Sequence, residues 1–103
     1  MAEKWDEKRV SEVSGSFWQA CTLQGAVKLD LFSLLGREGK TSGELAAATG
    51  SDLRGITAIL DALSAMALIV KKERVYFNTD ESSRLLDRNS RDYIGWRVLH
   101  HHY

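Results

Sequence analysis

The sequence predicts a mainly α-helical domain with one small β-hairpin, and three observations lead to this fold class. The 103 residues suit a single domain, and they include no proline, a residue that interrupts helices. Apolar residues recur every three or four positions along most of the chain, as they do in amphipathic helices. Two β-prone runs, 69–72 and 74–77, flank Glu73, and this pattern predicts a hairpin.

The charge balance and the cysteine content narrow the class of protein. Fourteen Lys and Arg residues balance fourteen Asp and Glu residues, whereas DNA-binding domains usually carry a basic excess. The sequence has no apolar run near the roughly 18–20 residues of a membrane span and no secretory signal pattern. The single cysteine, Cys21, cannot form an internal disulfide. We therefore expect a cytoplasmic protein for which neither a membrane nor a nucleic acid is the expected partner.

The first 35 residues contain two contrasting segments. Residues 1–13 carry seven charges among the first twelve positions and predict a charged N-terminal arm, which Trp5 could anchor on a neighbour or which is only a solvated leader. In residues 16–35, twelve of twenty positions are apolar and occupy two faces of a helix, which implies burial on both. We expect Gly25 to split this segment into two helices and Gly36 to end the second.

A domain of this size has too small an interior to bury both faces of residues 16–35. Obligate homodimer interfaces resemble a core divided between two subunits, so the excess apolar surface predicts a homodimer. The residues expected at the dimer interface are Phe17, Trp18, Cys21, Leu31 and Phe32. Periodicity alone leaves open which of them face the subunit's own core instead.

The middle of the chain predicts a helix-turn-helix followed by a wing. Thr41 and Glu44 match a capping box that starts a short helix, and Gly50 ends it. A second helix is expected over 53–69, and the two together form the helix-turn-helix. Because the hairpin follows directly, residues 14–90 are expected to form a winged helix-turn-helix flanked by N-terminal dimerisation helices.

Two further helices are expected after the wing. Thr79 caps the first, and Asn89 and Ser90 cap the second, which begins near Arg91. The sequence stops inside this second helix, so residues 91–103 are interpreted as the start of a linker helix that leads to a domain absent from this chain.

The residues form no recognisable catalytic, cofactor or metal site. Cys21 lies in an apolar helical stretch without cationic neighbours, and the eight glycines never form G-x-G-x-x-G. His100, His101 and His102 are adjacent, so a helix would point their imidazoles about 100° apart. Three interpretations of this triplet stay open: an ordinary helix end, a truncated purification tag, and a metal or catalytic contribution.

The predicted second helix also argues against sequence-specific recognition of DNA. In residues 53–69 only Arg54 and Asp61 are charged and twelve of seventeen residues are apolar, whereas a recognition helix presents polar side chains to base edges. The wing has three basic residues against Glu73. They either contact phosphates or form a solvated strand edge.

Several short motifs follow one another at a characteristic spacing. They are 26–35 (AVKLDLFSLL), 41–46 (TSGELA), 59–63 (ILDAL), 66–69 (MALI), 76–79 (YFNT) and Leu85-Leu86. In this order, residues 14–103 resemble the N-terminal winged-helix dimerisation domain of S-adenosylmethionine-dependent methyltransferases of the small-molecule O-methyltransferase type. That family often has glycine where this chain has Asp30 and Ala67, two departures that concern local turn geometry.

The resemblance implies a homodimer whose N-terminal domains also form part of the wall of the acceptor-substrate pocket. It implies S-adenosylmethionine as the cofactor of the full-length parent, bound in a C-terminal catalytic domain. No catalytic or cofactor-binding residue is therefore expected in this chain. The alternatives are a winged-helix transcription regulator that binds DNA and a winged-helix protein–protein adaptor.

Overall fold

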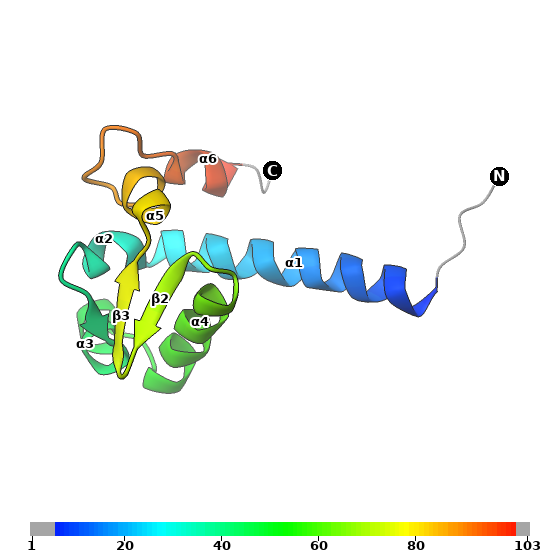
Figure 1. Ribbon diagram of the computed structural model, residues 1–103, viewed down its shortest axis with the longest axis horizontal. Helices are drawn as coiled ribbons and strands as arrows, with labels where there is room; N and C mark the ends of the chain where they lie inside the picture. Colours follow the sequence, from blue (N-terminus) through cyan, green and yellow to red (C-terminus); the bar gives the residue numbers. More distant parts are fainter. Residues whose placement is uncertain (1–5, 101–103) are drawn as a thin grey trace.

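The computed structural model describes the backbone of residues 6–100 and the side chains of residues 6–8, 10 and 18–99. In this part of the chain, one long helix projects from a globular body that holds the other elements (Figure 1). The elements are α1 (Glu7–Lys28), α2 (Leu31–Leu35), β1 (Lys40–Thr41), α3 (Ser42–Thr49), α4 (Leu53–Ala65), β2 (Ile69–Lys72), β3 (Val75–Asn78), α5 (Asp80–Leu85) and α6 (Gly95–His100).

The helix-turn-helix forms because the local sequence supplies a start and a stop for its helices. The Thr41 hydroxyl accepts a hydrogen bond from the Glu44 backbone N–H at 3.2 Å, and the Glu44 carboxylate accepts one from the Thr41 backbone N–H at 3.0 Å. α3 ends at Gly50, whose φ is 64°. α4 begins after Asp52, whose carboxylate accepts a hydrogen bond from the Gly55 N–H at 2.9 Å. The predicted capping box and glycine stop are confirmed.

A three-stranded antiparallel sheet in the order β1-β3-β2 completes the globular body. Val70 pairs with Phe77 in the predicted hairpin, and Lys40 pairs with Tyr76 on the other side of β3. The buried apolar side chains are Ala26, Val27, Leu31, Phe32, Leu35, Leu45, Ala46, Ile56, Leu60, Leu63, Ile69, Tyr76 and Leu86. The mainly helical winged-helix class is confirmed, while the two-residue strand β1 was too short for periodicity to predict.

The expected break at Gly25 is wrong. α1 continues through Gly25 to Lys28, and it begins at Glu7, so most of the predicted charged arm that the structure describes is helical. A glycine inside a helix costs only about 1 kcal/mol, which the burial of the adjacent Ala26 and Val27 outweighs. The chain breaks instead at Asp30, whose φ is 62°. Trp5 lies outside the described residues.

Other helix boundaries also need correction. Gly36 ends α2 as predicted, with a φ of 54°. α4 stops at Ala65 rather than at residue 69, because Ala67 turns the chain with a φ of 63°. The last helix begins at Gly95 rather than near Arg91, because consecutive turns occupy the residues before it.

Candidate functional site

The first half of α1, residues 7–17, is the candidate functional site. No other described element lies beside it (Figure 1), so a partner can pack against it. The buried side chains described in α1 are Thr22, Ala26 and Val27, all in its last two turns. The rest of the helix extends away from the globular body (Figure 1). This projection gives a radius of gyration of 15.1 Å, whereas a compact chain of this length has about 13 Å. Before Thr22, every α1 side chain that the structure describes is exposed, namely those of residues 7, 8, 10 and 18–21, and these are available to a partner.

The structure separates the five predicted interface residues into three groups. Trp18 is 63% exposed and Cys21 is exposed and free, so both can contribute to an interface. Leu31 and Phe32 are 0% and 1% exposed, so the subunit's own core leaves no surface of theirs for a partner. The prediction is corrected for these two residues, because α2 folds back onto the core. The side chain of Phe17 lies outside the described set.

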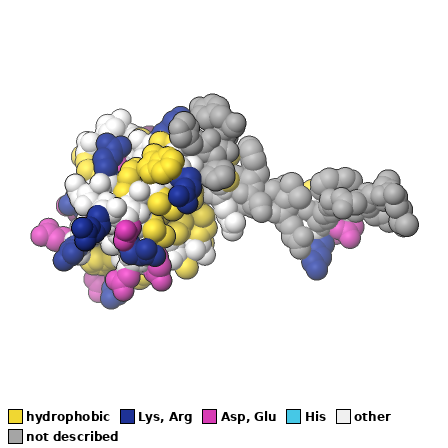
Figure 2. Space-filling model, turned by 90° about the horizontal axis from the view of Figure 1, so that it is seen from above, with side chains coloured by type: hydrophobic (Ala, Val, Ile, Leu, Met, Phe, Trp, Pro, Cys, Tyr) yellow, Lys and Arg dark blue, Asp and Glu magenta, His cyan; other side chains and the backbone are white. Residues whose placement is uncertain are grey.

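Exposed apolar side chains also occur beyond the predicted interface set. Val10 on α1 is 49% exposed, and Trp96 on α6 is 55% exposed with the Arg97 guanidinium 5.6 Å from its ring centroid. Val98 and Leu99 of the same helix are partly buried and pack against the core. Val98 lies two residues after Trp96 and therefore on the opposite side of a helix, a spacing that could have signalled the exposure of Trp96. Apolar side chains gather on the part of the globular body next to the projecting helix (Figure 2).

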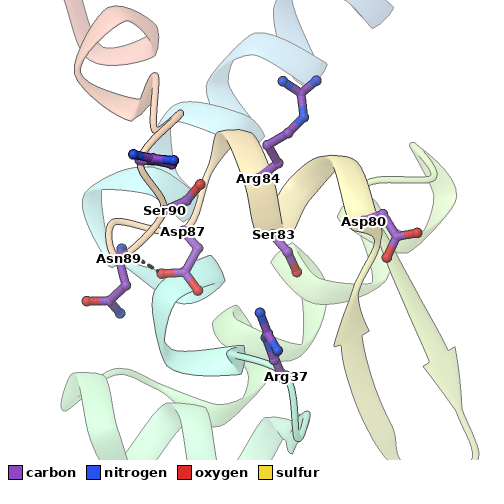
Figure 3. A pocket seen from close by; sticks show the side chains of 8 residues that line it. Arg37, Asp80, Ser83, Arg84, Asp87, Asn89 and Ser90 are labelled. Atoms are coloured by element: carbon purple, nitrogen blue, oxygen red, sulfur yellow. Dashed lines mark hydrogen bonds between the residues drawn. The ribbon is translucent and has the colours of Figure 1, made fainter.

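A polar cavity of about 450 Å³ lies beside α5 (Figure 3). It is lined by Arg37, Asp80, Ser83, Arg84, Asp87, Asn89, Ser90 and Arg91. The Asp87 carboxylate accepts a hydrogen bond from the Asn89 backbone N–H at 2.9 Å. Arg84 pairs with Asp92 at 3.9 Å, and both side chains are more than half exposed. Open mixed charge of this kind is typical of a solvated surface rather than of a catalytic site.

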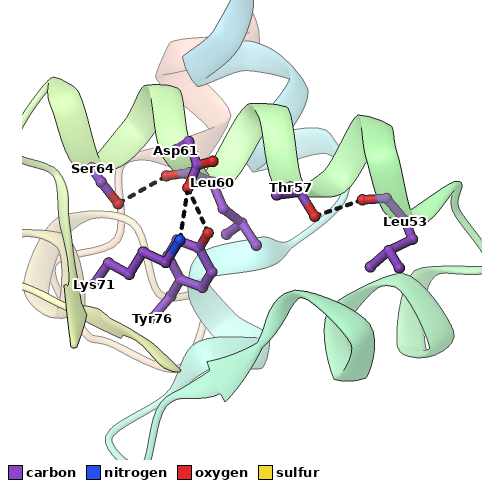
Figure 4. Close-up of polar contacts among 7 residues, drawn as sticks. All are labelled: Leu53, Thr57, Leu60, Asp61, Ser64, Lys71 and Tyr76. Atoms are coloured by element: carbon purple, nitrogen blue, oxygen red, sulfur yellow. Dashed lines mark hydrogen bonds and ion pairs between the residues drawn. The ribbon is translucent and has the colours of Figure 1, made fainter. Parts of the chain in front are cut away.

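A second polar cluster joins α4 to the wing (Figure 4). The Tyr76 hydroxyl donates a hydrogen bond to Asp61 Oδ1 at 2.5 Å, and Lys71 Nζ lies 3.6 Å from the same oxygen. Burial raises the pKa of Tyr76, and its hydrogen bond to Asp61 raises it further. Hydrogen bonding to Tyr76 and the charge of Asp61 raise the pKa of Lys71. Both groups stay protonated near neutral pH, so the cluster holds the wing against α4 and exchanges no proton.

The other predictions concern metal binding, the three adjacent histidines and membrane-spanning helices. Within the described part of the chain, no group of three His, Cys, Asp or Glu side chains is placed to hold a metal ion. The interpretations of His100, His101 and His102 concern side chains outside the described set. Of the helices that the structure describes, none combines the length and the apolar character that crossing a membrane requires.

The model of the O-methyltransferase dimerisation domain matches residues 11–88. The chain is 36% identical over 87 residues to the tetracenomycin polyketide synthesis 8-O-methyl transferase TcmO of Streptomyces glaucescens. This alignment covers 84% of the present chain and 26% of TcmO.

Solved structures share the fold. An O-methyltransferase family protein from Burkholderia thailandensis matches 97% of this chain with a TM-score of 0.83 and 31% identity, over 30% of its own length. Human N-acetylserotonin methyltransferase in complex with SAM matches 97% of this chain with a TM-score of 0.84 and 21% identity, over 31% of its own length. The chain thus spans between 26% and 31% of these relatives. Because the family model matches most of its residues, the chain belongs to the O-methyltransferase dimerisation domain family.

Proposed function

We propose that this chain is the homodimerisation part of an S-adenosylmethionine-dependent O-methyltransferase and that it forms part of the wall of the acceptor-substrate pocket. The observation that carries the proposal is the projecting first half of α1 (residues 7–17) together with the exposed Trp18 directly after it, in a member of a dimerisation-domain family. The curated relative TcmO is named as an 8-O-methyl transferase, which supports a methyltransferase as the parent protein.

Helix stability supports the same proposal. Short helices without tertiary contacts are marginal in water, and the first half of α1 has no described neighbour within the subunit. A second copy would supply these contacts and would also cover Trp18. Covering Trp18 favours association, because a large aromatic side chain buries about 150–250 Å². The interface residues that remain proposed are Phe17, Trp18 and Cys21.

The catalytic domain and the S-adenosylmethionine site belong, in this proposal, to further polypeptide of the parent protein. The chain has no G-x-G-x-x-G sequence of its own. Two structural neighbours were solved with SAM and with SAH, which supports this cofactor for the parent. A cytoplasmic location is also part of the proposal, and it rests on the free Cys21.

Binding of DNA by the helix-turn-helix gains no support. Ile56, Leu60 and Leu63 of α4 are buried, and Asp61 is held by Tyr76 and by the wing. A recognition helix needs several free polar side chains along its outer face, which α4 does not provide.

Sedimentation velocity over a range of concentrations tests the proposal, with Trp18→Ser as the test variant and Val70→Ser as the control. Val70 is also an exposed apolar residue, but it lies on β2. We expect the unmodified chain to sediment as a dimer and Trp18→Ser to weaken it by about 2 kcal/mol, or about thirtyfold in Kd. Val70→Ser should leave the Kd unchanged. A monomer at every concentration, or equal effects of the two variants, would contradict the proposal.

A further inference from the structure

A cavity of about 340 Å³ lies where the helix-turn-helix meets the wing. Its walls come from the start of α3, from α4 and from the hairpin, and none of its lining residues belongs to α1. In Figure 4, Leu53 and Thr57 of α4 lie on one side, and Lys71 and Tyr76 of the wing lie on the other. Pockets for small molecules begin at about 300 Å³, so this cavity suits a ligand of about one ring.

The surface that α4 offers to this cavity is mainly apolar. Leu53 is 53% exposed although it is a large apolar residue. The Thr57 hydroxyl already donates to the Leu53 carbonyl at 2.8 Å, and the Tyr76 hydroxyl already donates to Asp61. Leu53 and Thr57 therefore offer hydrocarbon surface rather than free hydrogen-bond donors, whereas Tyr76 is only 1% exposed and has Lys71 Nζ 5.2 Å from its ring centroid.

The cavity has one uncompensated positive charge. Lys71 lies 3.6 Å from the Asp61 carboxylate, which neutralises it. Arg74 also lines the cavity and is exposed, and it has no ion pair with any residue that the structure describes. A guanidinium matches the planar geometry of a carboxylate and can bind both of its oxygens. One free cation beside an apolar wall favours an organic anion with a single charge.

We propose that this cavity binds a small aromatic carboxylate, with its carboxylate on Arg74 and its ring against Leu53 and Thr57. The site is separate from the dimerisation surface on α1 and goes beyond the proposed dimerisation role. Inorganic phosphate fits less well, because it lacks an apolar body and carries more charge than Arg74 alone compensates. A nucleic-acid backbone would need a row of free cations.

Titration of the ¹⁵N-labelled chain with benzoate, followed by NMR, tests this site. Arg74→Gln removes the proposed carboxylate ligand, and Lys72→Gln removes a neighbouring exposed wing charge that does not line the cavity. Benzyl alcohol serves as the neutral probe of similar shape, and inorganic phosphate serves as the anion without a ring.

We expect benzoate to shift the amide signals of Leu53, Thr57 and Arg74, and we expect Arg74→Gln to weaken its binding about tenfold, as loss of one charge-assisted contact does. Lys72→Gln should change the Kd by less than about twofold, and benzyl alcohol and phosphate should both bind more weakly than benzoate. The site is wrong if benzoate shifts none of these signals, if the two variants weaken binding equally, or if phosphate binds as well as benzoate. Because the reporting amides lie in α4 and the wing rather than in α1, the result does not depend on whether the chain dimerises.

Discussion

Replacing Ala67 with glycine is expected to stabilise the protein, because Ala67 holds a backbone conformation that favours glycine. Its φ is 63°, in the left-handed region. The Leu68 N–H donates to the Leu63 carbonyl and the Ala67 N–H donates to the Ser64 carbonyl, both at 3.0 Å. This pair of bonds is the Schellman motif that closes a helix, usually with glycine at this position. In this protein the motif therefore contains an alanine at the position where glycine is favoured.

Gly50 provides a matched comparison within the same molecule. It ends α3 with a φ of 64°, and the Ser51 N–H donates to the Ala46 carbonyl at 3.0 Å. A Cβ at Gly50 would meet nothing within 4 Å, so Gly50→Ala adds backbone cost without a clash. The left-handed conformation costs an L-residue about 1–2 kcal/mol, and the greater freedom of unfolded glycine returns about 0.4–1 kcal/mol. Ala67→Gly should gain about 0.5–1 kcal/mol, and Gly50→Ala should lose a similar amount.

Equilibrium unfolding in guanidinium chloride, followed by circular dichroism, measures both effects. All variants must be compared at one protein concentration, because association couples to folding. In a domain of this size 1 kcal/mol shifts the Tm by about 4–8 °C, so the expected change is resolved by thermal unfolding as well. An Ala67→Gly protein no more stable than the unmodified chain, or a neutral Gly50→Ala, would refute the reasoning from backbone conformation.

Three other substitutions test separate contacts. Gly39 has a φ of 78°, and Gly39→Ala would place a Cβ 2.6 Å from the Phe77 ring. We expect this variant to lower the free energy of unfolding by at least about 2 kcal/mol. An unchanged Tm would contradict the packing of β1 on β3. Tyr76→Phe keeps the ring but removes the hydroxyl bonded to Asp61, and urea unfolding should show a loss of about 1–2 kcal/mol. Hydrogen bonds from Thr41 lower the pKa of Glu44. The ionised Glu44 carboxylate therefore stabilises the fold fully at a pH above its usual pKa of 4.5, and this stabilisation is lost as the pH falls through the lower folded-state pKa. The stability difference between the unmodified chain and Glu44→Gln should therefore change across this acidic range, and a constant difference would show that the capping carboxylate has no such role.

Local sequence signals account for the parts of the fold that were predicted correctly. The Thr41 and Glu44 capping box and the stops at Gly36 and Gly50 act within a few residues, so the sequence alone identifies them. Residue type alone did not predict the left-handed turns at Asp30 and Ala67, because alanine disfavours that conformation and aspartate adopts it only occasionally. The glycines that the resembled family often has at these two positions were the only signal. At Asp30, tertiary contacts support the turn, since Arg88 lies 3.5 Å from its carboxylate.

The candidate interface could be predicted only in part. Trp18 and Phe32 both lie in one apolar stretch with helical spacing, and periodicity treats them alike. The turn at Asp30 separates them, because it directs α2 into the core while α1 continues outward. The cavity beside the wing left no sequence signal, because its lining residues are spread between Thr41 and Tyr76 and only folding brings them together.

Dimerisation requires that a second copy covers the first half of α1, and hydrogen exchange measured by mass spectrometry tests this contact most directly. Backbone amides of an uncovered helix with no tertiary contacts exchange quickly, because local opening costs little free energy. We predict that protection in the first half of α1 rises with protein concentration, while protection in α4 changes much less. Fast exchange in that half of α1 at every concentration would contradict the account.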